Sequence, residues 1–218
     1  MEARARLNRE RVLASAIALA DEIGIAALSM RRLATQLDVV PMALYKHVAN
    51  KDQLLDGMVD TVINEIPRAA FEGEWRPAVR QQVLFARATL QNHAWARRVI
   101  ETRAGKSLAV LDYIESFTAL FLAGGFTPDL THHVMHALGG RMWGFTQELF
   151  EDTAPPAELP PAVLEQLAQR YPSILAVASP HSGDVVGDGC DDEFEFAFAL
   201  DLLLDGFDRL KQQAWSSR

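Results

Sequence analysis

The sequence predicts an all-α protein in which a three-helix unit with a helix-turn-helix precedes a longer helical region. Apolar residues recur at every third or fourth position over most of the chain, which is the spacing of amphipathic helices. No segment alternates apolar and polar residues over the length of a strand. Gly and Pro stand where the periodic segments begin and end, as they do at helix boundaries.

Caps and one tight turn organise the N-terminal unit. An amphipathic helix ends at Gly24, and Ser29 is placed to cap a short second helix. Asp38 falls in the turn that follows, and Asp tolerates a left-handed backbone better than most residues. Pro41 then opens a third helix, and Asn50 caps the helix after it. The second and third helices form a helix-turn-helix, whose later helix can enter the major groove of DNA.

The outward surface of this motif carries the candidate DNA contacts, although a plain helical hairpin with a solvated surface is the alternative interpretation. The candidates are Ser29, Arg31, Pro41, Met42, Ala43, Tyr45, Lys46, His47 and Lys51. Expected at phosphates are Tyr45, His47 and Lys51, and expected at or beside base edges are Arg31, Met42 and Lys46. Phosphate contacts position a protein on DNA, whereas base contacts specify the sequence.

The charge of the chain is divided unevenly. The formal net charge is −8, which by itself disfavours a nucleic-acid partner. Residues 1–52, however, hold eight Lys and Arg against six Asp and Glu, a net of +2, whereas the remainder carries −10. A basic head on an acidic body is typical of a DNA-binding protein.

Short motifs in the first third of the chain match the pattern of a known family. They are Ala27-Leu28-Ser29, Arg31-Arg32-Leu33-Ala34, Leu37, Leu44-Tyr45-Lys46-His47-Val48 and Asn50-Lys51 with Leu54-Leu55. This segment resembles the tetracycline-repressor (TetR) family of bacterial transcription factors, without gaps over residues 8–66. Asp38 is a departure, since the family usually has Gly there. The resemblance implies a helix-turn-helix DNA-binding domain at residues 1–66 and a helical effector-binding and dimerisation domain at residues 67–218.

The second region reads as a series of longer helices, and from residue 75 to about 149 it shows a weaker likeness to the ligand domain of tetracycline repressor. The helices are predicted at residues 75–92, 94–101, 107–123, 128–149, 162–171 and 194–213. A proline-rich connector with Pro155-Pro156 and Pro160-Pro161 precedes the fifth of these helices, and residues 180–192 read as a loop.

The final helix is apolar nearly all round, which predicts burial on both sides. We expect a homodimer in which this helix and the helix at residues 128–149 form a four-helix interface. A central core helix of the monomer is the alternative.

In this family the second domain senses a small molecule, so the resemblance implies a pocket among the middle helices. The candidate effector-binding residues are Gln82, Phe85, Trp95, Ile100, Arg103, Tyr113, Phe117, His136, Trp143 and Gln147. Tetracycline repressor holds a magnesium–drug chelate through a His at the position of Ile100, and an aliphatic side chain cannot bind a hard cation. We therefore expect neither tetracycline recognition nor a cofactor or metal, and a metal role for His132, His133 and His136 stays open.

Composition and motifs also exclude several classes of protein. No stretch approaches the roughly 18 apolar residues of a membrane span. We expect no signal peptide, and one cysteine, Cys190, suits a reducing cytoplasm. No phosphate loop, nucleophile elbow or metalloprotease motif is present, so no catalytic residues are predicted.

The resulting prediction is a cytoplasmic transcriptional regulator, not an enzyme. It is a repressor that leaves a palindromic DNA operator when a small, largely apolar effector binds the C-terminal domain. The alternatives are a constitutive DNA-binding protein without an effector and, less favoured, a helical enzyme.

Overall fold

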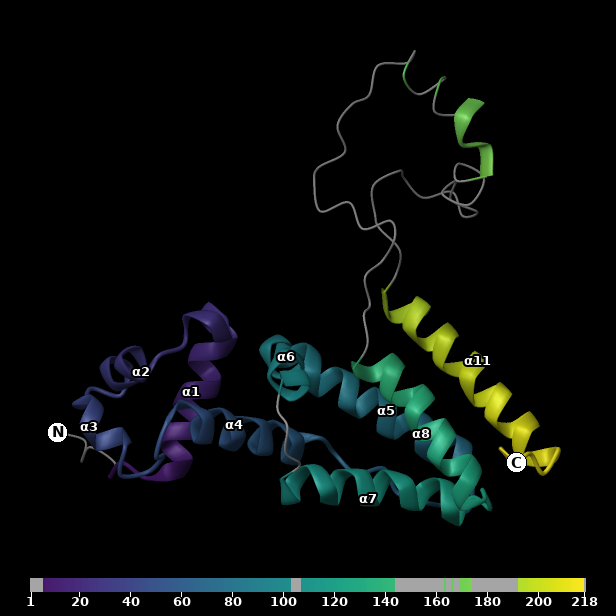
Figure 1. Cartoon of the computed structure of the whole chain (residues 1–218), viewed down its shortest axis with the longest axis horizontal. Helices are drawn as coiled ribbons and strands as arrows, with labels where there is room; N and C mark the ends of the chain where they lie inside the picture. The colour runs from purple at the N-terminus through teal and green to yellow at the C-terminus, as the bar shows by residue number, and fades with distance from the viewer. Residues whose placement is uncertain are drawn as a thin grey trace. The chain divides into compact units, whose positions relative to one another are not determined.

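The computed structural model describes residues 6–102, 107–143, 163, 166, 169–173 and 192–217, and of residues 140–143 only the backbone. Every regular element among these residues is a helix, which confirms the all-α prediction (Figure 1). The helices are α1 (Arg9–Ile23), η1 (Ile25–Ala27), α2 (Met30–Gln36), α3 (Pro41–Leu44), α4 (Lys51–Glu65), α5 (Trp75–Asn92), α6 (Ala94–Thr102), α7 (Leu108–Ala123), α8 (Pro128–Trp143) and α11 (Asp192–Gln212).

The chain divides into two compact units. One unit combines Met1–Gly144 with Asp201–Arg218, and the other is Phe145–Leu200. This division differs from the predicted boundary between a DNA-binding domain at residues 1–66 and an effector-binding domain at residues 67–218, which remains a proposal about function. The proline-rich connector, the predicted loop at residues 180–192 with Cys190, and most of the predicted helix at residues 162–171 lie outside the described residues.

Local side-chain caps fix the helix starts of the N-terminal region. The Ser29 hydroxyl accepts a hydrogen bond from the Arg32 amide at 3.3 Å, and the Asn50 side chain accepts one from the Gln53 amide at 2.8 Å. Asp38 has a φ of 54°, so the turn takes the left-handed conformation that the sequence predicts at this residue. These bonds satisfy amide groups that a helix start otherwise leaves unpaired.

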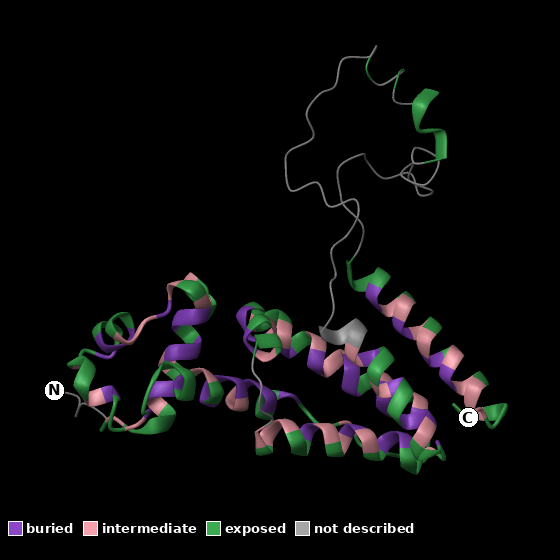
Figure 2. Cartoon of the chain, in the orientation of Figure 1, coloured by how far each residue is buried: buried purple, intermediate pink, exposed green. Residues whose placement is uncertain are grey.

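α1 and α4 pack closely because Gly57 has no side chain. A Cβ at Gly57 would lie 2.8 Å from the Leu13 side chain and 2.8 Å from the Arg9 guanidinium. Leu13 of α1 and Met58 of α4 are both buried, and Figure 2 shows buried segments on both of these contacting helices. The region from α1 to α4, called the head below, therefore has a tight hydrophobic core of its own.

An aromatic cluster joins α5, α7 and α11. The rings of Trp75 and Phe126 have centroids 4.7 Å apart, and the Phe121 ring lies 5.2 Å from Phe126 and 6.5 Å from Phe207. A Cβ at Gly124 would collide with the Trp75 side chain, so the chain needs glycine at this bend. The cluster fixes the C-terminal half of α11 on the core.

Two ion pairs reinforce the attachment of α11 to α5. Arg76 lies 2.6 Å from Asp205, and Arg80 lies 2.9 Å from Asp201. Both pairs are partly exposed, so their main effect is to fix the register of the two helices.

Only one face of α11 is buried in the single chain, so the helix is not the central core helix of a monomer, and burial of its other face remains an expectation for the dimer. The buried residues are Phe196, Leu200, Leu204 and Phe207, and the exposed large apolar residues are Phe194, Phe198 and Leu202.

Candidate DNA-binding and effector sites

The helix-turn-helix of α2 and α3 is held together by a small set of buried side chains. Leu33, Ala34, Leu44 and Val48 are almost completely buried. The Val39 amide donates to the Ala34 carbonyl oxygen at 2.9 Å, which closes the turn after α2. α3 itself ends at Leu44, and residues 45–47 continue as hydrogen-bonded turns, so the regular helix is shorter than the sequence predicts.

Opposite this core, α3 and the turn that follows it present apolar and basic side chains to solvent. Met42 is 70% exposed and Val40 is 69% exposed. Tyr45 and Lys46 are also exposed, whereas Ala43 and His47 are half-buried. Exposed apolar groups beside a lysine suit the major groove, where thymine methyl groups and phosphates lie within reach. The sequence reasoning missed Val40, although its position directly before Pro41 is a usable signal.

The remaining DNA-binding candidates have structural contacts as well as exposure. The Lys51 Nζ donates a hydrogen bond to the Leu28 carbonyl oxygen at 2.9 Å. Ser29 caps α2, and it lines a cavity of about 800 Å³ between α1 and α2 together with Arg31. Pro41 occupies the first turn of α3 and is exposed.

Among the effector candidates, Gln82 is the most buried polar residue, with 1% exposure. Its Nε2 donates to the Pro67 carbonyl oxygen at 3.1 Å, and its Oε1 accepts from the Ala69 amide at 2.9 Å. Both ends of the amide therefore hold the segment between α4 and α5. Gln82 thus positions this segment.

Tyr113 and Phe117 are neighbouring effector candidates on α7, which packs against α5. Their ring centroids are 6.1 Å apart, and both residues are buried. Among the described residues, the Tyr113 hydroxyl makes no hydrogen bond of ordinary geometry, although the Gln82 side chain interacts with it and lowers its pKa against the larger effect of burial. The Arg68 guanidinium lies over the Tyr113 ring, 4.8 Å from its centroid. Burial raises the pKa of Tyr113 to about 12, so the hydroxyl stays neutral and can donate.

The remaining effector candidates that the structure describes differ in burial and contacts. Trp95 is buried, and its indole Nε1 donates to the Asp21 carboxylate of α1 at 2.6 Å, so its polar end serves the contact with the head. Phe85 and Ile100 are half-buried. Arg103, Gln147 and the side chain of Trp143 lie outside the described residues.

Two histidines of α8 line a cavity that does not include Tyr113. His132 and His136 line a cavity of about 550 Å³ between α7 and α8 with Ile114 and Thr118, and Tyr113 is not among its lining residues. The His132 and His136 rings lie 4.6 Å apart. Within the part of the chain that the structure describes, no three His, Cys, Asp or Glu residues are grouped as a metal site.

No helix in the described ranges is both long enough and apolar enough to span a bilayer.

Two family models match the chain in succession. "Bacterial regulatory proteins, tetR family" matches residues 12–58, and "Tetracyclin repressor-like, C-terminal domain" matches residues 67–210. Together they cover the helix-turn-helix and the helices that carry the effector candidates.

Named relatives match along nearly the whole chain. The HTH-type transcriptional repressor DrrR1 of Streptomyces coeruleorubidus is 28% identical over 95% of this chain and 79% of its own length. The class D tetracycline repressor protein of Escherichia coli is 29% identical over 94% of this chain and 90% of its own. The crystal structure of the Streptomyces coelicolor TetR family protein ActR with actinorhodin is 25% identical, with a TM-score of 0.71 over 93% of this chain and 97% of that one.

Proposed function

The chain belongs to the TetR family of bacterial regulatory proteins, and from that premise we propose that it is a ligand-responsive transcriptional repressor. In its ligand-free form it binds a palindromic DNA operator, and a small, largely apolar effector releases it. The observation that carries this proposal is the surface of α3, where Val40 and Met42 are exposed while Leu44 is fully buried. Val40 and Met42 are two positions apart at the start of α3, and bound DNA would cover these exposed apolar side chains together with the neighbouring Lys46.

The proposed DNA contacts extend from this surface to its basic neighbours. Met42 and Lys46 meet base edges, with Arg31 beside them, and Tyr45 and His47 contact phosphates. Lys51 still has two N–H donors for a phosphate after its bond to Leu28. The remaining members of the set are Ser29, Pro41 and Ala43, which shape the approach of the backbone to DNA.

The effector site is proposed around Tyr113 and Phe117 of α7. A buried hydroxyl without a hydrogen bond of ordinary geometry costs about 1–3 kcal/mol, and an acceptor atom on a ligand would remove that cost. The effector is therefore a largely apolar molecule with at least one hydrogen-bond acceptor. Binding of a small molecule by this domain is also supported by the relative ActR, which was solved in complex with actinorhodin.

Dimerisation is proposed through the exposed apolar face of α11, together with α8. Phe194, Phe198 and Leu202 lie on this face, and the rings of Phe194 and Phe198 stack with centroids 6.3 Å apart. A dimer would bury these side chains and place two heads on one palindrome, with half-sites about 34–36 Å apart or slightly more.

Selection of bound sequences from a random DNA library tests the DNA-binding proposal. We expect a palindromic consensus bound as a dimer, with an affinity that falls steeply as salt increases. Failure to enrich any sequence above the starting library, with a folded dimeric protein, would contradict it.

A thermal-shift screen of small organic molecules then tests the effector proposal. A compound that raises the melting temperature and also releases the selected DNA supports a repressor controlled by a ligand. A constitutive DNA-binding protein would retain its DNA with every compound that binds. The family consists of transcriptional regulators. We propose that this chain acts in the cytoplasm, where bacterial DNA lies, and that it has no enzymatic activity. Chemical turnover of a bound compound would contradict the absence of enzymatic activity.

A further inference from the structure

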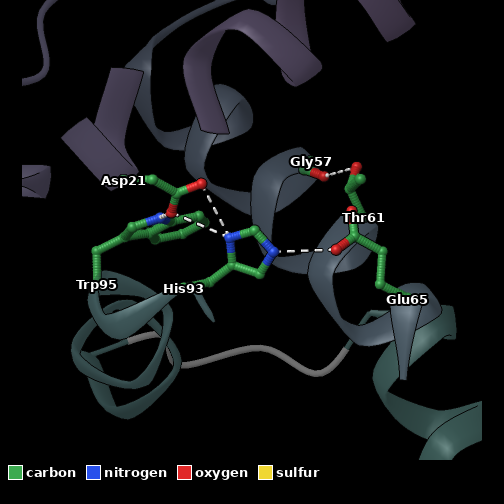
Figure 3. Close-up of polar contacts among 6 residues, drawn as sticks. All are labelled: Asp21, Gly57, Thr61, Glu65, His93 and Trp95. Carbon is green, nitrogen blue, oxygen red and sulfur yellow. Dashed lines mark hydrogen bonds and ion pairs between the residues drawn. The ribbon is translucent and has the colours of Figure 1, made fainter. Parts of the chain in front are cut away.

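His93 lies at the junction of α5 and α6, where these helices meet the head. It is the last residue before α6 begins, and α6 contacts both α1 and α4. Figure 3 shows its ring between the Asp21 carboxylate, which comes from α1, and the Glu65 carboxylate, which comes from α4. One side chain thus joins the two helices of the head to the helices that carry the proposed effector site.

Both nitrogens of the ring are used. Nδ1 lies 3.0 Å and 3.1 Å from the two carboxylate oxygens of Asp21, and Nε2 lies 3.0 Å from Oε2 of Glu65. A neutral imidazole has one N–H and one lone pair, so it donates to only one of two carboxylates. With two carboxylate acceptors, only the imidazolium donates on both sides. The geometry therefore fits the protonated ring.

The surroundings favour that charge. The His93 side chain is 14% exposed, and the charged groups that face it are Asp21 from α1 and Glu65 from α4. α6 contributes the neutral indole N–H of Trp95. Burial alone lowers the pKa of His93, but the hydrogen bonds and charges of the two carboxylates outweigh burial and raise the pKa above 6.5.

Asp21 and Glu65 differ in the hydrogen bonds and solvation that remain to them when the His93 ring loses its proton. Asp21 retains the hydrogen bond from Trp95 Nε1 at 2.6 Å. The Glu65 side chain is 47% exposed against 30% for Asp21, so water can solvate the Glu65 carboxylate at lower cost. Deprotonation therefore breaks the contact to α4 first and leaves the contact to α1.

We propose that His93, Asp21, Glu65 and Trp95 form a proton-dependent clasp that couples the head to the effector-sensing helices. The protonated ring holds α1 and α4 against the start of α6, and loss of the proton releases the C-terminal end of α4. α4 is the last helix of the head, and its C-terminal end leads to α5. Its release therefore changes how freely the head moves when DNA or an effector binds. The inference rests on the proposed repressor function for its consequence, but the clasp itself can be tested without DNA.

The first test measures the protonation of His93 in the full-length dimer. In a proton NMR titration, the Cε1–H signal assigned by loss in His93→Gln should report a pKa above 6.5, and Glu65→Gln should lower that pKa. A pKa at or below 6.5, or one that Glu65→Gln leaves in place, would overturn the clasp. His132→Gln is the matched control, because it removes an exposed histidine from α8.

The second test measures the pH dependence of stability. A histidine whose folded pKa is raised stabilises the fold fully below its unfolded pKa of about 6.5, and the stabilisation is lost as pH rises through the folded pKa. The wild type should therefore lose more melting temperature between pH 6 and pH 9 than His93→Gln, whose amide donates at every pH. Equal losses in the two proteins would overturn the proposal.

The third test asks whether the clasp reaches the DNA. The Kd for a DNA duplex selected from a random library is measured at pH 6 and pH 8 for wild type and His93→Gln. We expect the ratio of the two Kd values to differ between the proteins by about fivefold or more, the lower end of ordinary allosteric coupling. His47 is present in both proteins, so any effect of this residue on DNA binding is common to both ratios and does not alter the comparison.

The outcomes separate the clasp from the repressor function. If no DNA is bound, the repressor proposal fails, and the NMR and unfolding measurements still decide whether the clasp exists. If DNA is bound with the same pH dependence in both proteins, coupling through His93 is refuted. Should His93→Gln fold poorly, the same comparison with Glu65→Gln serves, because that variant keeps the histidine and removes only one charge.

Discussion

The ammonium of Lys51 donates a hydrogen bond to the carbonyl oxygen of Leu28 at 2.9 Å, although the two residues are 23 positions apart. Leu28 is buried at the end of η1, and Lys51 opens α4. The bond thus ties the start of α4 to the segment that leads into α2. A residue assigned to phosphate binding on sequence grounds therefore also has a structural contact within the head.

Lys51→Ala should weaken two properties at once. Loss of the bond to Leu28 should lower the stability of the fold by about 1 kcal/mol, since a charged donor is removed from a partly buried carbonyl. Loss of a phosphate contact should reduce the slope of log Kd against log salt by about one unit for every DNA sequence. Chemical denaturation and salt-dependent anisotropy measure the two effects. A normal salt slope with reduced stability would restrict Lys51 to the structural contact.

Lys46→Ala in the exposed turn after α3 should act on DNA binding alone. The side chain is exposed, so the melting temperature should not change. Affinity for the selected operator should fall by about 1–3 kcal/mol, with relaxed preference at one base position in each half-site. Arg209→Ala removes an equal charge from an exposed position on α11 and should leave DNA affinity nearly unchanged. Equal losses in the two variants would assign the effect to net charge.

The sequence predicted those features that depend on near neighbours. Ser29, Asp38, Pro41 and Asn50 act on backbone groups within a few positions, and the structure has each in the predicted conformation or capping role. The order of helices also follows, because apolar periodicity reports which face of each helix is buried.

Periodicity does not report which partner a buried polar group meets. Gln82 was predicted to line a pocket, yet its amide holds residues 67 and 69, and the Trp95 indole bonds to Asp21, 74 positions away. His93 gave no local signal, because its two carboxylate partners are 72 and 28 positions away. Only the packing of α1, α4 and α6 brings these groups together.

Leu202→Glu should dissociate the proposed dimer and leave each chain folded. Leu202 is 56% exposed on α11 in the single chain, so a carboxylate there costs little until a second copy covers it. Light scattering and analytical ultracentrifugation should show a folded monomer. A Leu202→Glu protein that remains a dimer would assign the interface elsewhere.

Phe207→Glu should instead damage the fold. Phe207 also lies on the apolar final helix, but it is 6% exposed, and its ring packs on Phe121 with centroids 6.5 Å apart. Removing such a ring typically costs about 3–5 kcal/mol, and a buried unpaired charge adds to the loss. Circular dichroism should show reduced helix content or a strongly lowered melting temperature. A stable, native-like Phe207→Glu monomer would place this residue at the interface.

Tyr113→Phe should separate effector binding from folding. The variant removes a buried hydroxyl that makes no hydrogen bond of ordinary geometry among the described residues, so the melting temperature of the effector-free protein should be unchanged or higher. Because the pKa of Tyr113 is about 12, the hydroxyl is a neutral donor throughout pH 6–9, and effector binding should not depend on its ionisation.

With a compound found by thermal shift, Tyr113→Phe should bind about 1 kcal/mol more weakly in calorimetry, the usual net value of one hydrogen bond. Tyr171→Phe is the matched control, since that tyrosine is exposed. A lower melting temperature for effector-free Tyr113→Phe would mean that the hydroxyl already has a partner in the free protein. Unchanged affinity for the compound would show that the effector does not bond to the Tyr113 hydroxyl, and it would move the proposed site away from this pair of α7 rings, whose centroids are 6.1 Å apart.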